Sequence, residues 1–374
     1  MEERLWWLAL SLVPGVGRIS FKRLIDEFGR PEEVFNASLS DLESVQGIKK
    51  EAASAIKSFD RDRELDRERA LIRENNVNLL TLEDKEYPDQ LREIFDPPSL
   101  LYVKGQIKKE DEHSVAIVGT RHPTRYGKLT AERLAFELGA LGVTVVSGMA
   151  RGIDTFSHEG ALSVGGRSIA VFGSGLDVVY PPENREIMEK IIDNGAIISE
   201  FPMGTRPEKQ NFPVRNRIIS GLSLGTVVVE AASKSGSLIT ARLALEQGRE
   251  VFAVPGSIAS DKSRGTNNLL KLGAKLVEGV DDIIEELKPL IDSLSEKRHD
   301  DTKKEESSEV SSAGARFTKE EEEIFSLVSK EGDHIDSIIQ GSEVPPSKTV
   351  SILAKLELLG LVKQYSGKIF YRER

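Results

Sequence analysis

The chain of 374 residues contains no cysteine, which excludes disulfides, thiolate metal sites and cysteine nucleophiles. It has only five histidines, and no two of them have the spacing that a metal-binding pair needs. No apolar run approaches the roughly 20 residues of a membrane-spanning helix. We therefore expect a protein without a metal site or a cofactor, and one that does not enter a membrane.

Targeting signals are also absent from the start of the sequence. The segment Met1–Pro14 lacks the basic start and the small-residue cleavage site of a signal peptide. Together with the lack of cysteine, this indicates a cytoplasmic protein. Hydrophobic residues make up 39% and charged residues 30% of the chain, which is typical of a soluble globular protein. The length suggests two or three domains.

The net charge of −10 argues, taken over the whole chain, against a partner that is a nucleic acid. Binding depends on local potential, however, and the charges are unevenly spread. The window Gly204–Ser220 contains a single acidic residue and four basic ones: Arg206, Lys209, Arg215 and Arg217. This window is therefore a candidate site for an anionic ligand.

Residues 1–75 are expected to form an N-terminal helical domain interrupted by glycine turns. The turn Pro14-Gly15-Val16-Gly17 resembles the hairpin of SAM- or helix-hairpin-helix-like domains, in which amides at a helix start can bind a phosphate. A weaker copy lies at residues 45–49. A small helical bundle with glycine turns is the interpretation that we favour, because short glycine motifs are common. Residues 76–113 are expected to be a connector with one or two short strands.

Residues 114–294 change to alternating strands and helices. The strands are continuous apolar runs, which is typical of strands that are buried on both faces. The sequence therefore predicts an α/β domain with a doubly wound, mostly parallel sheet.

Residues 295–316 are rich in charged residues and serine, and they predict a flexible linker. Residues 317–374 then follow the order helix, short helix, helix and hairpin, which predicts a C-terminal winged helix. A capping box is expected at Thr318 and Glu321. The second half of this unit is basic and its first helix is acidic, so contact with DNA and docking to a protein are equally compatible with the sequence.

Ligands of open α/β sheets bind beyond the carboxyl ends of the strands. At those ends this sequence has glycine- and hydroxyl-rich turns, which bring backbone amides close to an anion. Cations and an aromatic residue follow the turns, and arginine binds phosphates while aromatic rings stack on bases. The candidate site residues are Thr120, Arg121, Ser147, Arg151, Gly173, Lys209, Phe212, Arg215, Asn216, Arg217, Ser235, Gly236 and Ser237.

Common enzyme motifs are missing from the same turns. The sequence has no dinucleotide-binding Gly-x-Gly-x-x-Gly, no P-loop and no nucleophile turn with a matching histidine. Of the carboxylates near the edge, Asp154 is expected to be the N-cap of its helix. Asp177 and Glu200 could be salt-bridge partners of the arginines.

Seven ordered sequence blocks resemble the DNA-processing protein A family, also called DprA or Smf. They run in order over about 160 residues, which makes the match far more specific than any single short motif. The blocks are Val115–Arg121, Ser147–Asp154, Tyr180–Asn184, Ser199–Pro202, Phe212–Ser223, Ser235–Ala241 and Phe252–Gly256. The resemblance implies an extended Rossmann-like domain that binds single-stranded DNA.

Several further properties are implied by the resemblance alone. They are protection of incoming DNA and its delivery to the RecA recombinase during natural transformation, a homodimer formed through the Rossmann-like domain, and no established catalytic chemistry. The family's DNA-contacting arginine, lysine and stacking aromatic fall on Arg121, Lys209 and Phe212. Thr120 stands where serine is common and Met149 where leucine is common, and neither change puts the groove in doubt.

An enzyme is the alternative. Lysine-decarboxylase-like phosphoribohydrolases are similar in outline and would use the same edge for a nucleotide phosphate. Their glycine-rich motif is only faintly matched by Leu224-Gly225-Thr226.

Overall fold

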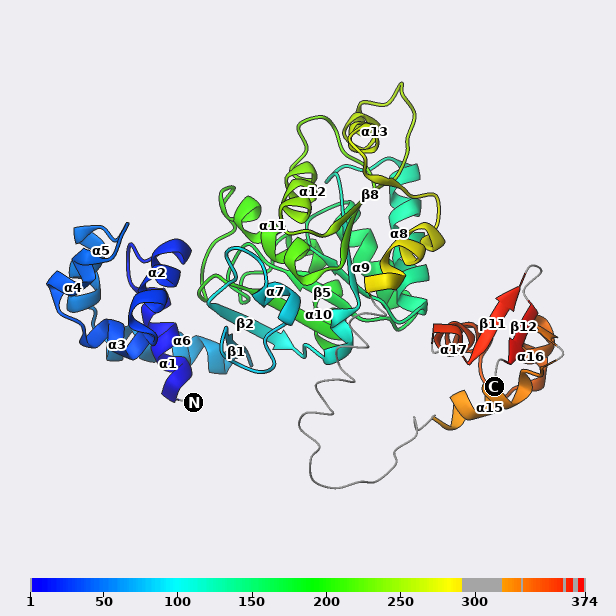
Figure 1. The fold of residues 1–374 in the computed structure, drawn as a ribbon, viewed down its shortest axis with the longest axis horizontal. Helices are drawn as coiled ribbons and strands as arrows, with labels where there is room; N and C mark the ends of the chain where they lie inside the picture. The colour runs from blue at the N-terminus through cyan, green and yellow to red at the C-terminus, as the bar shows by residue number, and fades with distance from the viewer. Residues whose placement is uncertain (1, 291–317, 331, 359–360, 366–368, 373–374) are drawn as a thin grey trace.

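The N-terminal region is helical, as the sequence predicts (Figure 1). The structure is a computed structural model that describes residues 2–290, 318–330, 332–358, 361–365 and 369–372. The turns before α2 and α5 contain Gly15 and Gly47 at φ 84° and 82°, a backbone conformation that glycine adopts without strain. The helices are α1 (Glu2–Leu12), α2 (Arg18–Phe28), α3 (Pro31–Asn36), α4 (Leu39–Ser44), α5 (Lys50–Ser58) and α6 (Arg61–Glu74).

A nine-stranded sheet forms the centre of the molecule, in the order β1-β2-β6-β5-β4-β3-β7-β8-β9. From β6 to β9 every neighbouring pair is parallel. The strands are β1 (Asn78–Thr81), β2 (Leu100–Gly105), β3 (Ser114–Val118), β4 (Thr144–Ser147), β5 (Ser168–Val171), β6 (Gly195–Ser199), β7 (Gly225–Val228), β8 (Glu250–Ala253) and β9 (Lys275–Leu276). The Rossmann-like, mostly parallel sheet is therefore confirmed.

Strands β1 and β2 extend this sheet. β2 pairs antiparallel with β6, and β1 pairs antiparallel with β2. The segment that we expected to be a connector, residues 76–113, thus contributes two strands to the large sheet. Local sequence did not indicate this pairing, because β2 and β6 lie far apart in the chain.

Helices cover both faces of the sheet (Figure 1). Alternate residues of β3 point to opposite faces, as in any strand: Ile117 packs with the core under α8 and α9, and Val118 packs with the core under α11 and α12. The helices are α7 (Asp89–Arg92), α8 (Arg125–Ala140), α9 (Ile153–Ser163), α10 (Arg185–Asp193), α11 (Asn211–Leu222), α12 (Ser237–Glu246) and α13 (Arg264–Lys271). A further helix covers residues 280–290.

The N-terminal helices share one hydrophobic core with the β2–β6 side of the sheet. Trp7 and Phe21, stacked at 5.5 Å between ring centroids, belong to the same buried cluster as Tyr102 and Met203. In Figure 1 these helices lie beside β1 and β2. The helical region is therefore packed against the sheet rather than merely tethered to it.

The C-terminal unit has the helix and hairpin order of a winged helix. It comprises α15 (Lys319–Leu327), α16 (Ile335–Gly341), α17 (Pro346–Leu358), β11 (Val362–Tyr365) and β12 (Ile369–Arg372), with a short additional strand β10 (Asp333–His334) paired to β12. The predicted capping box at Thr318 and Glu321 is confirmed. The predicted linker, residues 295–316, lies outside the described residues.

No helix in the described ranges combines the length and the apolarity that crossing a membrane requires.

Candidate nucleic-acid interface

A groove lies at the carboxyl ends of β3, β4 and β7 and encloses about 610 Å³. The strand order reverses here, since β4 lies on one side of β3 and β7 on the other. Such a reversal is where open α/β sheets bind their ligands. The groove is lined by Val118, Gly119, Arg121, Ala150, Asp154, Tyr180, Pro207, Lys209, Phe212, Pro213, Arg215, Asn216, Ile219, Ser235, Gly236, Ser237, Ile239 and Thr240.

Two exposed cations line this groove together with an aromatic ring. The Arg121 guanidinium carbon lies 4.9 Å from the centroid of the half-buried Phe212 ring. Lys209 is exposed on the loop that leads into α11. Neither cation forms an ion pair with another residue of the described chain within 4.0 Å. Both side chains can therefore bind a phosphate without first breaking a salt bridge.

The start of a helix also lines the groove. Helix α12 begins at Ser237, and its N-cap residue Gly236 supplies no side-chain cap. The Ser235 and Ser237 hydroxyls lie 2.8 Å apart. The first amides of α12 donate to Ser235 and Gly236, so the two hydroxyls and the positive end of the helix dipole are what favour an anion here.

Arg215 lies beneath Phe212 as part of the groove floor and is only 3% exposed. Its Nη1 donates to the carbonyl oxygens of Gly148, at 2.7 Å, and of Val171. Burial lowers the pKa of the guanidinium to about 10, an effect that Asp154 opposes. Arg215 thus joins α11 to the ends of β4 and β5, and its hydrogen-bonding capacity is largely used inside the protein.

Asp154 is the buried carboxylate of the floor. Burial raises its pKa to about 6, although Arg215 acts in the other direction. Our expectation that Asp154 is the N-cap of its helix is wrong, because the N-cap residue of α9 is Gly152. The carboxylate instead accepts a hydrogen bond from the Ala150 amide at 3.3 Å, which stabilises the turn before the helix.

Arg217 does not line the groove, although the sequence placed it among the candidate contacts. Its side chain is 3% exposed and is ion-paired with Glu200 at 2.6 Å and Asp96 at 3.1 Å. Residues two apart on a helix point in nearly opposite directions, so Arg215 and Arg217 cannot both face one groove. The expected pairing of Glu200 with an arginine is confirmed, whereas Asp177 accepts from the Gly204 amide instead.

The remaining candidates mostly stabilise the turns. Thr120 donates through its amide to the Glu230 carbonyl at 2.8 Å, and the Ser147 hydroxyl is buried and donates to the Ile117 carbonyl. Arg151 is exposed and ion-paired with Glu183. Of these three residues, none lines the groove.

Gly173 and Asn216, the last two candidates, have different roles. A Cβ at Gly173 would lie 3.2 Å from the Phe212 ring, so this glycine leaves room for the aromatic side chain. Asn216 lines the groove and accepts from Arg215 Nε at 3.3 Å.

Tyr180 and Ile239 belong to the groove and were missed. The Tyr180 ring centroid lies 6.0 Å from that of Phe212, and Ile239 is 37% exposed. An aromatic residue within a matched sequence block was the available signal for Tyr180. Nothing in the local pattern distinguished Ile239 from a core residue of α12.

Within the described residues, no group of three or more His, Asp or Glu side chains could bind a metal ion.

Comparisons with known proteins identify the family of this chain. Residues 78–288 match the family described as DNA recombination-mediator protein A, and residues 306–368 match the DprA winged helix domain. Protein Smf of Synechocystis is 35% identical over an alignment of 394 residues, which covers 99% of both chains. The chain belongs to the DprA/Smf family.

Two solved DprA structures are similar to this chain. The protein from Streptococcus pneumoniae superposes with a TM-score of 0.67 at 35% identity, covering 76% of this chain and 98% of that one. The protein from Helicobacter pylori has a TM-score of 0.51 at 36% identity, covering 57% of this chain and 96% of that one. The latter structure was described for its single-stranded DNA binding mode.

Proposed function

We propose that this DprA/Smf family member binds single-stranded DNA in the groove, without catalysis. Arg121 and Lys209 bind backbone phosphates, the Phe212 ring stacks on a base, and the Ser235 and Ser237 hydroxyls at the start of α12 donate to a further phosphate. Binding of this kind is salt-sensitive and nearly independent of sequence.

The observation that carries the proposal is the arrangement around Phe212. A half-buried aromatic ring lines the same groove as two exposed cations, Arg121 and Lys209, that have no ion-pair partner in the described chain, and Arg121 lies 4.9 Å from the ring. A site for a lone phosphate needs no such ring, whereas base stacking does. The single-stranded DNA binding mode described for the Helicobacter pylori DprA adds support from a relative.

The test is a titration of the full chain with a fluorescent oligo-dT at several salt concentrations. We expect Arg121→Ala and Lys209→Ala each to weaken binding and to reduce the salt slope by about 0.7, the value for one lost phosphate contact on a single strand. Arg69→Ala is the control, since Arg69 is an exposed arginine of α6 that does not line the groove. Wild-type affinity and slope in both groove variants would refute the assignment.

The enzyme alternative depends on one observation, the groove carboxyl of Asp154 with its raised pKa. A nucleotide phosphoribohydrolase would use such a group as an acid or a base. Calorimetry with AMP and ATP beside the oligo-dT titration separates the two functions. Tight mononucleotide binding without oligonucleotide binding would favour the enzyme.

The wider role that we propose follows the family. The protein protects incoming strands in the cytoplasm and loads RecA on them during natural transformation and recombination. We further propose that it acts as a homodimer formed through the Rossmann-like domain. Light scattering at micromolar concentration tests the dimer, and a RecA filament assay on the bound strand tests the loading.

A further inference from the structure

The N-terminal helical region contacts the groove wall from behind. That wall consists of α11 and of the loop 200–210 that precedes it and carries Lys209. Two polar contacts, besides the shared hydrophobic core, connect the N-terminal helices to this wall. Each contact reaches a different part of it.

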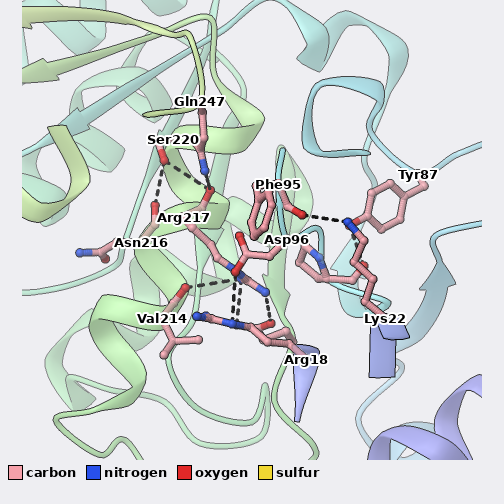
Figure 2. A network of polar contacts seen from close by, with 12 residues as sticks. Arg18, Lys22, Tyr87, Phe95, Asp96, Val214, Asn216, Arg217, Ser220 and Gln247 are labelled. Atoms are coloured by element: carbon pink, nitrogen blue, oxygen red, sulfur yellow. Dashed lines mark hydrogen bonds and ion pairs between the residues drawn. The ribbon is translucent and has the colours of Figure 1, made fainter. Parts of the chain in front are cut away.

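The first contact is a chain of alternating charges (Figure 2). Arg18, the first residue of α2, places its Nε 3.1 Å from Asp96 Oδ2. The same Asp96 oxygen lies 3.1 Å from Nε of Arg217 on α11. Arg217 also donates to both carboxylate oxygens of Glu200, at 3.0 and 2.6 Å. One shared carboxylate therefore connects α2 to α11.

The second contact reaches the loop. Glu68 on α6 is only 6% exposed, and its Oε1 accepts from the Met203 amide and from the Tyr102 hydroxyl, both at 2.8 Å. Burial raises the pKa of Glu68, and the two hydrogen bonds act in the opposite direction. The N-terminal region thus fixes the backbone of the loop six residues before Lys209.

Helix α11 transmits this arrangement to the groove. Phe212, Arg215, Asn216 and Ile219 follow helical spacing on its groove face. Arg217 projects from the other face, toward Asp96 and Glu200. A shift of the back face would therefore move the Phe212 ring relative to Arg121.

We propose that the N-terminal helical region is a positioning element of the groove, acting through Arg18, Asp96 and Arg217 on helix α11. Its effect on DNA rests on the proposed function, whereas its effect on the order of α11 does not. Arg18 is here a positioning residue, and it makes no contact with the DNA.

The size of the effect is limited by the strength of the contact. A distant residue changes the affinity of a site only through an interaction whose free energy differs between the free and the DNA-bound protein. The change in binding free energy cannot exceed that difference. The Arg18 side chain is 41% exposed, and ion pairs of that kind are weak. We therefore expect the Kd for oligo-dT to rise by about two- to fivefold when Arg18 loses its charge.

The chain offers a closely matched control. Arg4 on α1 pairs with Asp84 at 2.7 Å and is 42% exposed, against 41% for Arg18. Both arginines thus join an N-terminal helix to an aspartate of residues 76–113. The Asp84 carboxylate accepts from Arg4 and from Thr81, which lie outside α11, whereas the Asp96 carboxylate pairs with Arg217 of that helix.

The experiment compares full-length wild type with Arg18→Gln, Arg18→Lys, Asp96→Asn and Arg4→Gln. Hydrogen–deuterium exchange measures the order of residues 201–222 without DNA, and an oligo-dT titration over salt measures binding. We expect Arg18→Gln and Asp96→Asn to speed exchange in residues 201–222 and to raise Kd at an unchanged salt slope. Arg18→Lys keeps the charge and should recover binding, and Arg4→Gln should match wild type.

Four results would overturn the proposal. The first two concern Arg18→Gln: unchanged exchange in residues 201–222, or an unchanged Kd despite faster exchange. The third is an effect of Arg4→Gln equal to that of Arg18→Gln. The fourth is a salt slope that Arg18→Gln reduces by about 0.7, which would make Arg18 a phosphate contact. If wild type fails to bind oligo-dT, the proposed function fails. The exchange measurement then still decides whether Arg18 orders α11.

Discussion

Arginines on the two sides of helix α11 lie in opposite environments. On the groove side, Phe212 is half-buried and Arg121 approaches it from the turn after β3, without an ion-pair partner in the described chain. On the back face, Arg217 is buried between Glu200 and Asp96. Arg121 is thus available to a ligand, whereas the carboxylates of Glu200 and Asp96 occupy Arg217. The role of an arginine in this protein is decided by its neighbours rather than by its charge.

The largest effect is expected from Arg217→Met, which breaks the ion pairs of the back face. Glu200, whose side chain is only 12% exposed, would lose its partner, and an unpaired charge that is fully buried costs about 3–5 kcal/mol. Burial already raises the pKa of Glu200 even with Arg217 in place. We expect a large fall in Tm, measured by differential scanning fluorimetry.

A double variant, Glu200→Gln with Arg217→Met, is the matched control for this prediction. Because it replaces the unpaired Glu200 carboxylate with a neutral amide, it should recover part of the lost Tm. A single variant as stable as wild type would show that the back face does not depend on the pair.

A smaller effect is expected from Phe212→Ala on the groove face. Loss of one stacked base should weaken oligo-dT binding by about 1–3 kcal/mol, with Tm near the wild-type value because the ring is only half-buried. The salt slope should not change, since Phe212 neutralises no phosphate. Phe212→Tyr keeps a stacking ring and should bind like wild type. Equal losses from both variants would argue against stacking.

The smallest effect is expected from a decrease in pH, which lowers stability through the buried His158. His158 is fully buried, and its Nδ1 lies 2.7 Å from the Ser168 hydroxyl. Burial, with a further contribution from Arg215, lowers its pKa to about 3. The unfolded chain takes up this proton near pH 6.5 and the folded chain does not, so the stability from neutral His158 is present above pH 6.5 and falls as the pH decreases.

At pH 5.5 this loss should amount to about 1 kcal/mol relative to pH 7.5. The measurement is Tm at both pH values for wild type and His158→Gln. The advantage of wild type over the variant should shrink at pH 5.5. An advantage that is constant, or that grows on acidification, would show that His158 is not held neutral.

Much of the fold followed from local sequence. The apolar runs of β3 and β4 and the glycine turns after them marked a parallel sheet and its ligand edge. Helical spacing alone could have shown that Arg215 and Arg217 face different ways, but it could not show which of them faces the groove. That depended on Asp96, which is 121 residues away along the chain.

The sequence by itself determined the order of the elements, the edge of the sheet that holds the candidate groove, and the family. These features depend on short-range periodicity and on turn residues, which a short stretch of neighbouring residues determines. Only the tertiary structure decided that residues 76–113 join the sheet and that Arg215 and Arg217 are buried. It alone placed the N-terminal helices behind the groove wall. Pairings such as β2 with β6 and Arg18 with Asp96 join distant segments, and their burial and charge balance exist only once the chain has folded.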